Sequence, residues 1–311
     1  MRSVPRGAAL ACAVMATDLA IDVVLRHTAG KGLLEAPRYD DALGLVFSDA
    51  RNGGVHRLAD DGNVTTLLHH RRGIGGIALH ERGGFVVGGR NVAYKRDDAT
   101  PTVELLGQDP AVRRNGFNDL TTDARGRVYV GSLGEVAIDN DKNPARVPGG
   151  IEVLDLDGSS RRVADGLKLA NGMGLSPDGR RLYVSDSLRP AVLAYDVDPQ
   201  TGDLGAETTF FTFDEGAPDG LALSDDGLVW VALARTGRVV ALAPDATVAA
   251  RLDVPVPLVT SVAFGGRDRT TLFITTGTEG DDDPADAAIY AAEVPYRGLP
   301  VPRARVPVHG P

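Results

Sequence analysis

The chain has 311 residues, and its 33 basic and 42 acidic side chains give a formal net charge of -9. This acidic balance argues against a surface for nucleic acid or for an anionic membrane. A single cysteine, Cys12, excludes an intrachain disulfide framework and argues against a cysteine-based metal site. We expect a protein whose partner is a small molecule, with no nucleic-acid or membrane partner, as a monomer or a small homo-oligomer.

The N-terminal 16 residues are expected to lie outside the fold. They combine basic residues, Arg2 and Arg6, with the short alanine-rich run Ala8–Ala16, which resembles a weak secretory signal. Because no clear cleavage site follows, we expect a cytoplasmic protein, with export as the alternative. Residues 17–311 are expected to form one domain, and no segment in them reaches the length of a membrane span.

A short apolar run that ends in a small or polar residue recurs along the chain. Its copies are Leu45–Asp49, Phe85–Gly89, Val128–Ser132, Leu182–Asp186, Val229–Leu233 and Leu272–Thr276. They lie 40, 43, 54, 47 and 43 residues apart, and a turn rich in glycine and aspartate precedes most of them. Most copies lead into further strands, such as Ala191–Asp196. Four antiparallel strands in each of six units predict an all-β, six-bladed β-propeller.

Two segments stand apart from the repeats. Thr17–Ala29 precedes the first copy, and we expect it to supply the strand that closes the ring with the last unit. Glu135–Gly149 lies within the longest step, and we expect it to be an insertion over one face. Gly73–Ala78 fits a loose dinucleotide-binding fingerprint, but no helix is expected to follow it, so we do not assign it that role.

Polar residues precede or begin the innermost strand of several units. They are Glu35, Asn118, Asp119, Asn171 and Asp219. Alone, each is typical of a turn residue that bonds its own backbone. The inner strands of a propeller line one central channel, however, so all these side chains would meet there. Their oxygen atoms suit one hard divalent cation, Ca²⁺ first, with Mg²⁺, Mn²⁺ or Zn²⁺ as alternatives.

The same stretches resemble one known family, the senescence marker protein-30/gluconolactonase/luciferin-regenerating enzyme-like family. The similar motifs are Glu35-Ala-Pro-Arg-Tyr, Phe117-Asn-Asp, Asn171-Gly-Met, Pro218-Asp-Gly-Leu and Thr260-Ser-Val-Ala-Phe-Gly-Gly. They follow one another in the family's order, and the resemblance covers roughly Leu33–Thr276. It implies a six-bladed propeller with one catalytic divalent metal ion.

The resemblance also implies roles for individual residues. Glu35, Asn171 and Asp219 match the family's metal ligands, and Asp219 also matches its proposed general base. Asn118 matches a residue that touches substrate or metal-bound water. Asp219 and Asn118 are therefore the expected catalytic residues, and Asn118 and Asp119 are expected to contact the substrate.

One position departs from the family's pattern. Sugar-lactonase members often carry an arginine two residues before the asparagine matched by Asn118, and this chain has Gly116 there. Arg113 or Arg114 would have to reach in instead, and we name Arg114 as the expected substrate contact. The departure puts a sugar lactone in doubt as the substrate.

The leading hypothesis is a calcium- or other metal-dependent hydrolase that opens a lactone by attack of metal-activated water. The first alternative keeps the metal but uses it for a non-hydrolytic reaction, such as a cyclisation or an isomerisation in specialised metabolism. The second alternative is a propeller that binds a small molecule without catalysis. Neither a His-Glu-x-x-His nor a Gly-x-Ser-x-Gly motif occurs in the sequence.

Overall fold

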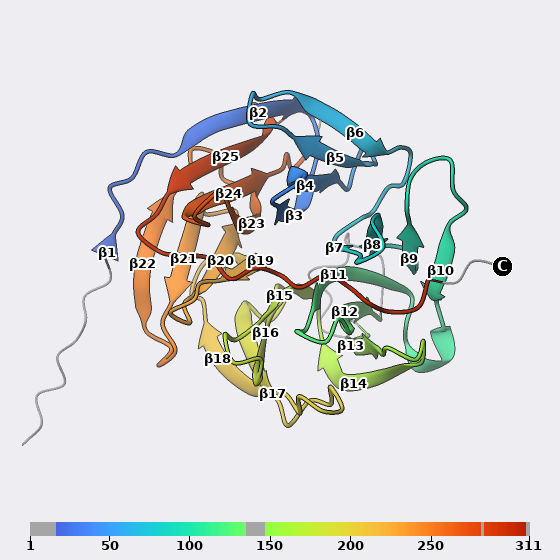
Figure 1. The fold of residues 1–311 in the computed structure, drawn as a ribbon. Coiled ribbons are helices and arrows are strands. Elements are labelled where there is room, and N and C mark those ends of the chain that lie inside the picture. The colour runs from blue at the N-terminus through green and yellow to red at the C-terminus, as the bar shows by residue number, and fades with distance from the viewer. Residues whose placement is uncertain (1–16, 135–146, 281–282, 309–311) are drawn as a thin grey trace, which may run out of the picture.

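The computed structural model describes residues 17–134, 147–280 and 283–308, and it arranges them as a ring of six antiparallel sheets (Figure 1). Blade one comprises β3 (Leu34–Asp40), β4 (Gly44–Asp49), β5 (Val55–Leu58) and β6 (Val64–Leu68). Blade two comprises β7 (Ile77–Leu79), β8 (Phe85–Val87), β9 (Val92–Lys95) and β10 (Val103–Leu106). Blade three comprises β11 (Gly116–Thr122), β12 (Val128–Leu133), β13 (Gly149–Leu154) and β14 (Ser160–Leu167).

The second half of the chain completes the ring. Blade four comprises β15 (Ala170–Leu175), β16 (Arg181–Asp186), β17 (Ala191–Asp196) and β18 (Thr208–Thr212). Blade five comprises β19 (Ala217–Leu223), β20 (Val229–Ala234), β21 (Arg238–Leu242) and β22 (Val248–Asp253), joined by the short β1 (Thr17–Asp18). Blade six comprises β23 (Val259–Gly265), β24 (Thr271–Thr276), β25 (Ala287–Glu293) and β2 (Val24–Gly30). The all-β, six-bladed propeller predicted from the sequence is confirmed.

Hydrogen bonds between two distant parts of the chain close the ring. β2 pairs antiparallel with β25, so the outermost strand of the last blade comes from the N-terminal region (Figure 1). The prediction that Thr17–Ala29 closes the ring is confirmed for its second half. Its first two residues instead form β1, which pairs parallel with β22 of blade five.

The core lies between neighbouring blades. Because each blade packs on both faces, its middle strands are buried on both sides and contain nearly continuous apolar runs. β20 is buried along its whole length, and its Trp230 packs edge-on against Phe264 of blade six, with ring centroids 5.7 Å apart. The described part of the chain contains no helix long and apolar enough to span a membrane.

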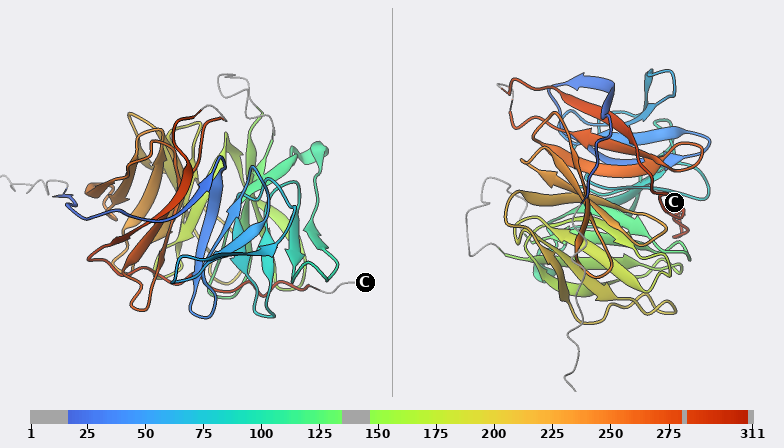
Figure 2. Two further views of the ribbon diagram at one scale, coloured as in Figure 1. Left: turned by 90° about the horizontal axis from the view of Figure 1, so that it is seen from above. Right: turned by 90° about the vertical axis from the view of Figure 1, so that its left-hand side faces the viewer.

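The two faces of the ring differ. One face holds the points where the inner strands begin, and we call it the site face. Across the opposite face runs Arg297–Val308, which we call the C-terminal strap (Figures 1 and 2). Leu299 donates its backbone N–H to Leu223 at the end of β19, and Ala304 donates to Leu79 at the end of β7. The strap therefore crosses the channel on the face where the inner strands end.

Candidate metal and substrate site

The inner strands of blades three, four and five each contain a bulge close to the site face. In each bulge, two residues of the inner strand oppose one residue of its neighbour. Asn118, Asn171 and Asp219 are the first residues of these three bulged pairs. A bulge bends its strand and re-aims the side chains next to it. Three side chains that are far apart in sequence thus occupy equivalent positions in their three blades.

Blade one has the same bulge, but Glu35 is offset by one position. Glu35 is still paired with Ser48, and the bulged pair that follows is Ala36 and Pro37. Ala36 has a φ of 51°, in the left-handed region that residues with a side chain rarely adopt. The backbone at this position therefore differs from that of the other three bulges.

Electrostatic interactions show that the carboxylates converge. Burial raises the pKa of Glu35 well above its usual range, and the charges of Asp219 and Asp119 raise it further. Burial also raises the pKa of Asp219 well above its usual range, Asp119 adds to the effect, and a hydrogen bond from Asn171 opposes it. Like charges raise each other's pKa only when they lie near each other. Blades one, three and five thus bring three carboxylates together.

Side-chain hydrogen bonds leave oxygen atoms free to bind a ligand. Asn171 donates its Nδ2 to Ser187 Oγ at 3.2 Å, and Ser187 Oγ in turn donates to the carbonyl of Pro218 at 2.7 Å. The amide nitrogen of Asn171 is thereby committed, and its Oδ1 is not. Asp219 Oδ1 is buried without a hydrogen-bond partner among the described residues. A buried carboxylate oxygen without a hydrogen-bond partner is costly, and an ion or a water molecule bound to it would remove that cost.

These residues fit a hard divalent cation. Within the described ranges, no three His, Cys, Asp or Glu side chains are grouped so that they could hold a metal ion by themselves. An ion here would need an amide oxygen beside the carboxylates of Glu35 and Asp219, and Asn171 has one to offer. Carboxylate and amide oxygens are the ligands that Ca²⁺ prefers, and the unpartnered Asp219 Oδ1 agrees with that requirement.

Asn118 lies between blades two and four. Its Nδ2 donates to the backbone carbonyl of Ala170 at 3.1 Å. On its other side, Gly75 lies so close that a Cβ there would overlap Asn118 Oδ1. Gly75 and Gly76, within the stretch Gly73–Ala78, therefore permit close packing against Asn118. The strand β7 follows them, as expected from the sequence, so the helix that a dinucleotide-binding fingerprint requires is not formed by these residues.

With this geometry established, comparison with known proteins identifies the family. The sequence profile described as the SMP-30/gluconolactonase/LRE-like region matches residues 33–278. The chain belongs to this family. The resemblance on which the site residues were predicted is therefore confirmed at the level of the family.

Individual relatives cover most of the chain. A 6-deoxy-6-sulfogluconolactonase of Pseudomonas putida is 32% identical over 270 residues, which is 83% of this chain and 89% of that protein. Pentonolactonase XacC of Haloferax volcanii is 30% identical over 278 residues, or 84% of this chain and 90% of that protein.

Solved structures agree on the fold. A luciferin-regenerating enzyme superposes with a TM-score of 0.83 at 23% identity, over 92% of this chain and all 100% of the other. A calcium-binding regucalcin from Agrobacterium tumefaciens gives 0.81 at 21% identity, over 94% of this chain and 100% of the other.

In this family member, Asp119 is buried and held by a residue that the sequence analysis missed. Arg38 of β3 donates Nη2 to Asp119 Oδ1 at 3.3 Å and to the carbonyl of Leu120 at 2.7 Å. Burial raises the pKa of Asp119, and Arg38 opposes that rise. The side chain of Asp119 is only 4% exposed. A carboxylate so enclosed has little surface to offer a substrate.

Arg114 is engaged away from the three carboxylates. Its Nε donates to the carbonyl of Gly107 at 2.9 Å, and its Nη1 lies 3.7 Å from Glu152 Oε2. Glu152 belongs to β13, the third strand outward from the channel in blade three. Arg113 is exposed, with a φ of 55°. Most of the predicted insertion Glu135–Gly149 lies outside the described residues.

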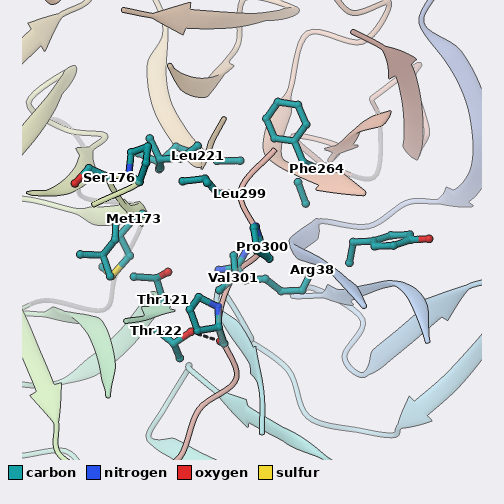
Figure 3. A pocket seen from close by; sticks show the side chains of 18 of the residues that line it. Arg38, Thr121, Thr122, Met173, Ser176, Leu221, Phe264, Leu299, Pro300 and Val301 are labelled. Carbon is teal, nitrogen blue, oxygen red and sulfur yellow. Dashed lines mark hydrogen bonds between the residues drawn. The ribbon is translucent and has the colours of Figure 1, made fainter. Parts of the chain in front are cut away.

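A separate cavity opens on the strap face. It has a volume of about 310 Å³ and is lined by inner-strand residues such as Thr121, Met173 and Leu221, and by Leu299 and Val301 of the strap (Figure 3). Glu35, Asn118, Asn171 and Asp219 do not line it. Arg38 does, and it also bonds Asp119, so its side chain lies between this cavity and the carboxylates.

Proposed function

We propose that the chain is a lactonase that hydrolyses a cyclic ester with the help of one divalent metal ion. The observation that carries the proposal is the convergence of Glu35, Asn171 and Asp219, with Asp219 Oδ1 buried and unpartnered among the described residues. Two relatives whose names describe lactone hydrolysis, at 32% and 30% identity, support the same reaction class.

In this proposal, Glu35, Asn171 and Asp219 hold the ion. The bound ion would supply a Lewis acid that polarises an ester carbonyl and lowers the pKa of water. Ca²⁺ is our first choice because the three residues offer only oxygen ligands. Mg²⁺, Mn²⁺ and Zn²⁺ are the alternatives that the experiment below compares.

The chain's own side chains would orient the lactone and move the proton. We assign the second carboxylate oxygen of Asp219, Oδ2, as the atom that takes the proton from the attacking water, because Oδ1 is the oxygen available to the ion. A carboxylate beside a cation is a weak base, but burial and the charge of Asp119 raise the pKa of Asp219 and partly offset that weakness. Asn118 is the first residue of the bulge in β11, as Asn171 and Asp219 are in β15 and β19. We assign its amide to orient the ester carbonyl.

We propose that the substrate is not restricted to sugar lactones. Gly116 stands where the resemblance led us to expect a sugar-binding arginine, and Arg114 is held by Gly107 and Glu152. An arginine committed to two protein partners is poorly placed to bind sugar hydroxyls. A small molecule with fewer hydroxyls would not need that contact.

The test is lactone hydrolysis by the metal-stripped protein before and after adding Ca²⁺, Mg²⁺, Mn²⁺ or Zn²⁺ separately. The substrates should span sugar lactones and apolar lactones. We expect one metal to restore activity, and Asp219→Asn to lower kcat by about a hundredfold or more while the fold is kept. Asp268→Asn is the control, because Asp268 is exposed in the turn between β23 and β24 on the strap face.

Two results would contradict the proposal. Hydrolysis that survives complete removal of metal would exclude the assigned role of the ion. Metal binding without opening of any lactone in the panel would redirect attention to the non-hydrolytic and binding alternatives.

A further inference from the structure

The Arg38–Asp119 ion pair crosses from blade one to blade three inside the channel. The two side chains are 8% and 4% exposed, and Arg38 Nη2 lies 3.3 Å from Asp119 Oδ1. Arg38 also donates to the carbonyls of Pro37 at 2.8 Å and Leu120 at 2.7 Å. Asp119 Oδ1 accepts the N–H of Leu120 at 2.7 Å. The pair is thus fixed from both strands, at the boundary between the strap-face cavity and the carboxylates.

The pair matters for the charge of the candidate metal site. Asp119 is the second residue of the bulged pair that Asn118 begins, so it lies beside the candidate site. Its charge acts on both Glu35 and Asp219. Arg38 bonds Asp119 directly, so when Glu35, Asp119 and Asp219 are all ionised, as ligands of a cation must be, the group with Arg38 carries two negative charges. Two negative charges are what one divalent cation neutralises. In an enclosed channel, charges separated by several ångströms still interact strongly because little water screens them.

A second cation acts on the site from outside. Arg235 lowers the pKa of Asp219, but its side chain is 61% exposed and pairs with Glu279 at 2.6 Å. Solvent and its own partner screen the charge of Arg235. Of these two arginines, Arg38 would therefore act on the site more strongly if it lost its counter-ion, Asp119.

We propose that the Arg38–Asp119 pair sets the charge of the candidate metal site at two negative charges, and so selects a divalent cation. Asp119 then serves as the counter-ion of Arg38 and not as a substrate contact. Both are positioning residues, which act through the charge and geometry that they impose on Glu35, Asn118 and Asp219. The inference rests on the proposed function in that it places a cation at Glu35, Asn171 and Asp219.

The test measures Ca²⁺ binding to the metal-stripped full chain by titration calorimetry, without any substrate. Asp119→Asn keeps the shape of the side chain but leaves the positive charge of Arg38 without its counter-ion. We expect the Ca²⁺ dissociation constant to rise at least about tenfold. Adding Arg38→Met removes the uncovered charge, and the double variant should return to within about threefold of the wild type.

A matched control separates charge from stability. Asp123 and Arg127 form another buried pair in blade three, with Arg127 Nε 2.6 Å from Asp123 Oδ2. Their turn joins the ends of β11 and β12 on the strap face. Asp123→Asn also leaves a buried arginine uncovered, and it should lower the unfolding temperature without changing the Ca²⁺ dissociation constant.

The outcomes distinguish this inference from the proposed function. A wild-type protein that binds no Ca²⁺, Mg²⁺, Mn²⁺ or Zn²⁺ overturns both. A wild type that binds an ion, with Asp119→Asn binding equally well, overturns only the role of the pair. If Asp119→Asn does not fold, Arg38→Met alone decides, because it leaves the charge of Asp119 without its counter-ion: a lower Ca²⁺ dissociation constant than that of the wild type supports the inference, and an unchanged one overturns it.

Discussion

Glycine at the site face of blade two shapes the candidate site by leaving space. Blades three, four and five each have a polar side chain in the bulge near the start of the inner strand, whereas Gly75 and Gly76 precede β7. Gly75 faces the end of the Asn118 side chain, and Gly76 faces backbone atoms of blade three, with Leu120 N 2.6 Å from where a Cβ would stand. Gly75 faces a side chain that can rotate, and Gly76 faces backbone that cannot, so we expect substitution of the two glycines to have different effects.

We predict that Gly75→Ala moves Asn118 and lowers activity without unfolding the protein. The new Cβ would overlap Asn118 Oδ1, which can rotate away but then loses its position over the site. Displacing an orienting group by about 1 Å can cost up to a hundredfold in rate, and we expect at least a tenfold loss of kcat in the lactone assay. The unfolding temperature, measured by calorimetry, should change by only a few degrees.

Two further variants serve as comparisons for Gly75→Ala. Gly280→Ala is the control, because no atom of the described residues lies within 4 Å of a Cβ built there. Gly76→Ala should instead lower the unfolding temperature, since it meets backbone that cannot rotate away. If Gly75→Ala keeps full activity, Asn118 does not act where we assign it.

The C-terminal strap is the element that covers the other mouth of the channel. His80, which is 1% exposed, fixes its far end. His80 Nδ1 accepts the N–H of Arg82 at 3.2 Å, so Nε2 carries the proton and donates to the carbonyl of Val306 at 2.9 Å. Burial lowers the pKa of His80 below the usual 6.5. The folded protein therefore holds this histidine neutral.

This neutral histidine predicts a loss of stability in acid. Because the pKa of His80 is lower in the folded protein, the unfolded chain takes up a proton there more readily as the pH falls through 6.5, and the free energy of unfolding decreases until the folded protein is protonated as well. His80→Gln cannot titrate. We expect the stability difference between wild type and His80→Gln, measured by urea unfolding from pH 7.5 to 5, to shift in favour of the variant as the pH falls.

A second histidine variant checks that His80 is responsible. The side chain of His70 is exposed, and His70→Gln should follow the wild-type pH dependence. Parallel stability curves for the wild type and His80→Gln would contradict the role assigned to His80.

At the scale of the whole molecule, the repeats made the fold predictable. Each hairpin carries an apolar run, a turn and a second run within a few residues, so local patterns define six blades. The sequence suggests Asn171 and Asp219 as site residues because polar residues recur near the start of equivalent inner strands and match the family's motifs. Arg38 could not be predicted, since its partner Asp119 lies 81 residues further along the chain. The strap could not either, because its Leu-Pro-Val-Pro run forms no named strand and has no repeat to reveal it.

The ring as a whole depends on β2. Its burial is slight, and Val24 and Leu25 are each 53% exposed, so its contribution comes mainly from backbone hydrogen bonds to β25. Without it, β25 would become an unpaired edge strand, which invites association with other chains. The ring would also lose the pairing that joins its first and last blades.

Two shortened chains test this closure. Of the described residues, a chain without residues 1–22 loses β1 and the partly buried Leu19 and Ile21, and its unfolding temperature should fall by only about 2 to 4 °C. A chain without residues 1–30 also loses β2. Several hydrogen bonds at about 1 kcal/mol each predict a fall of about 10 °C or more in calorimetry. Equal stability of the two chains would mean that blade six holds the ring with three strands, and that closure by β2 contributes little.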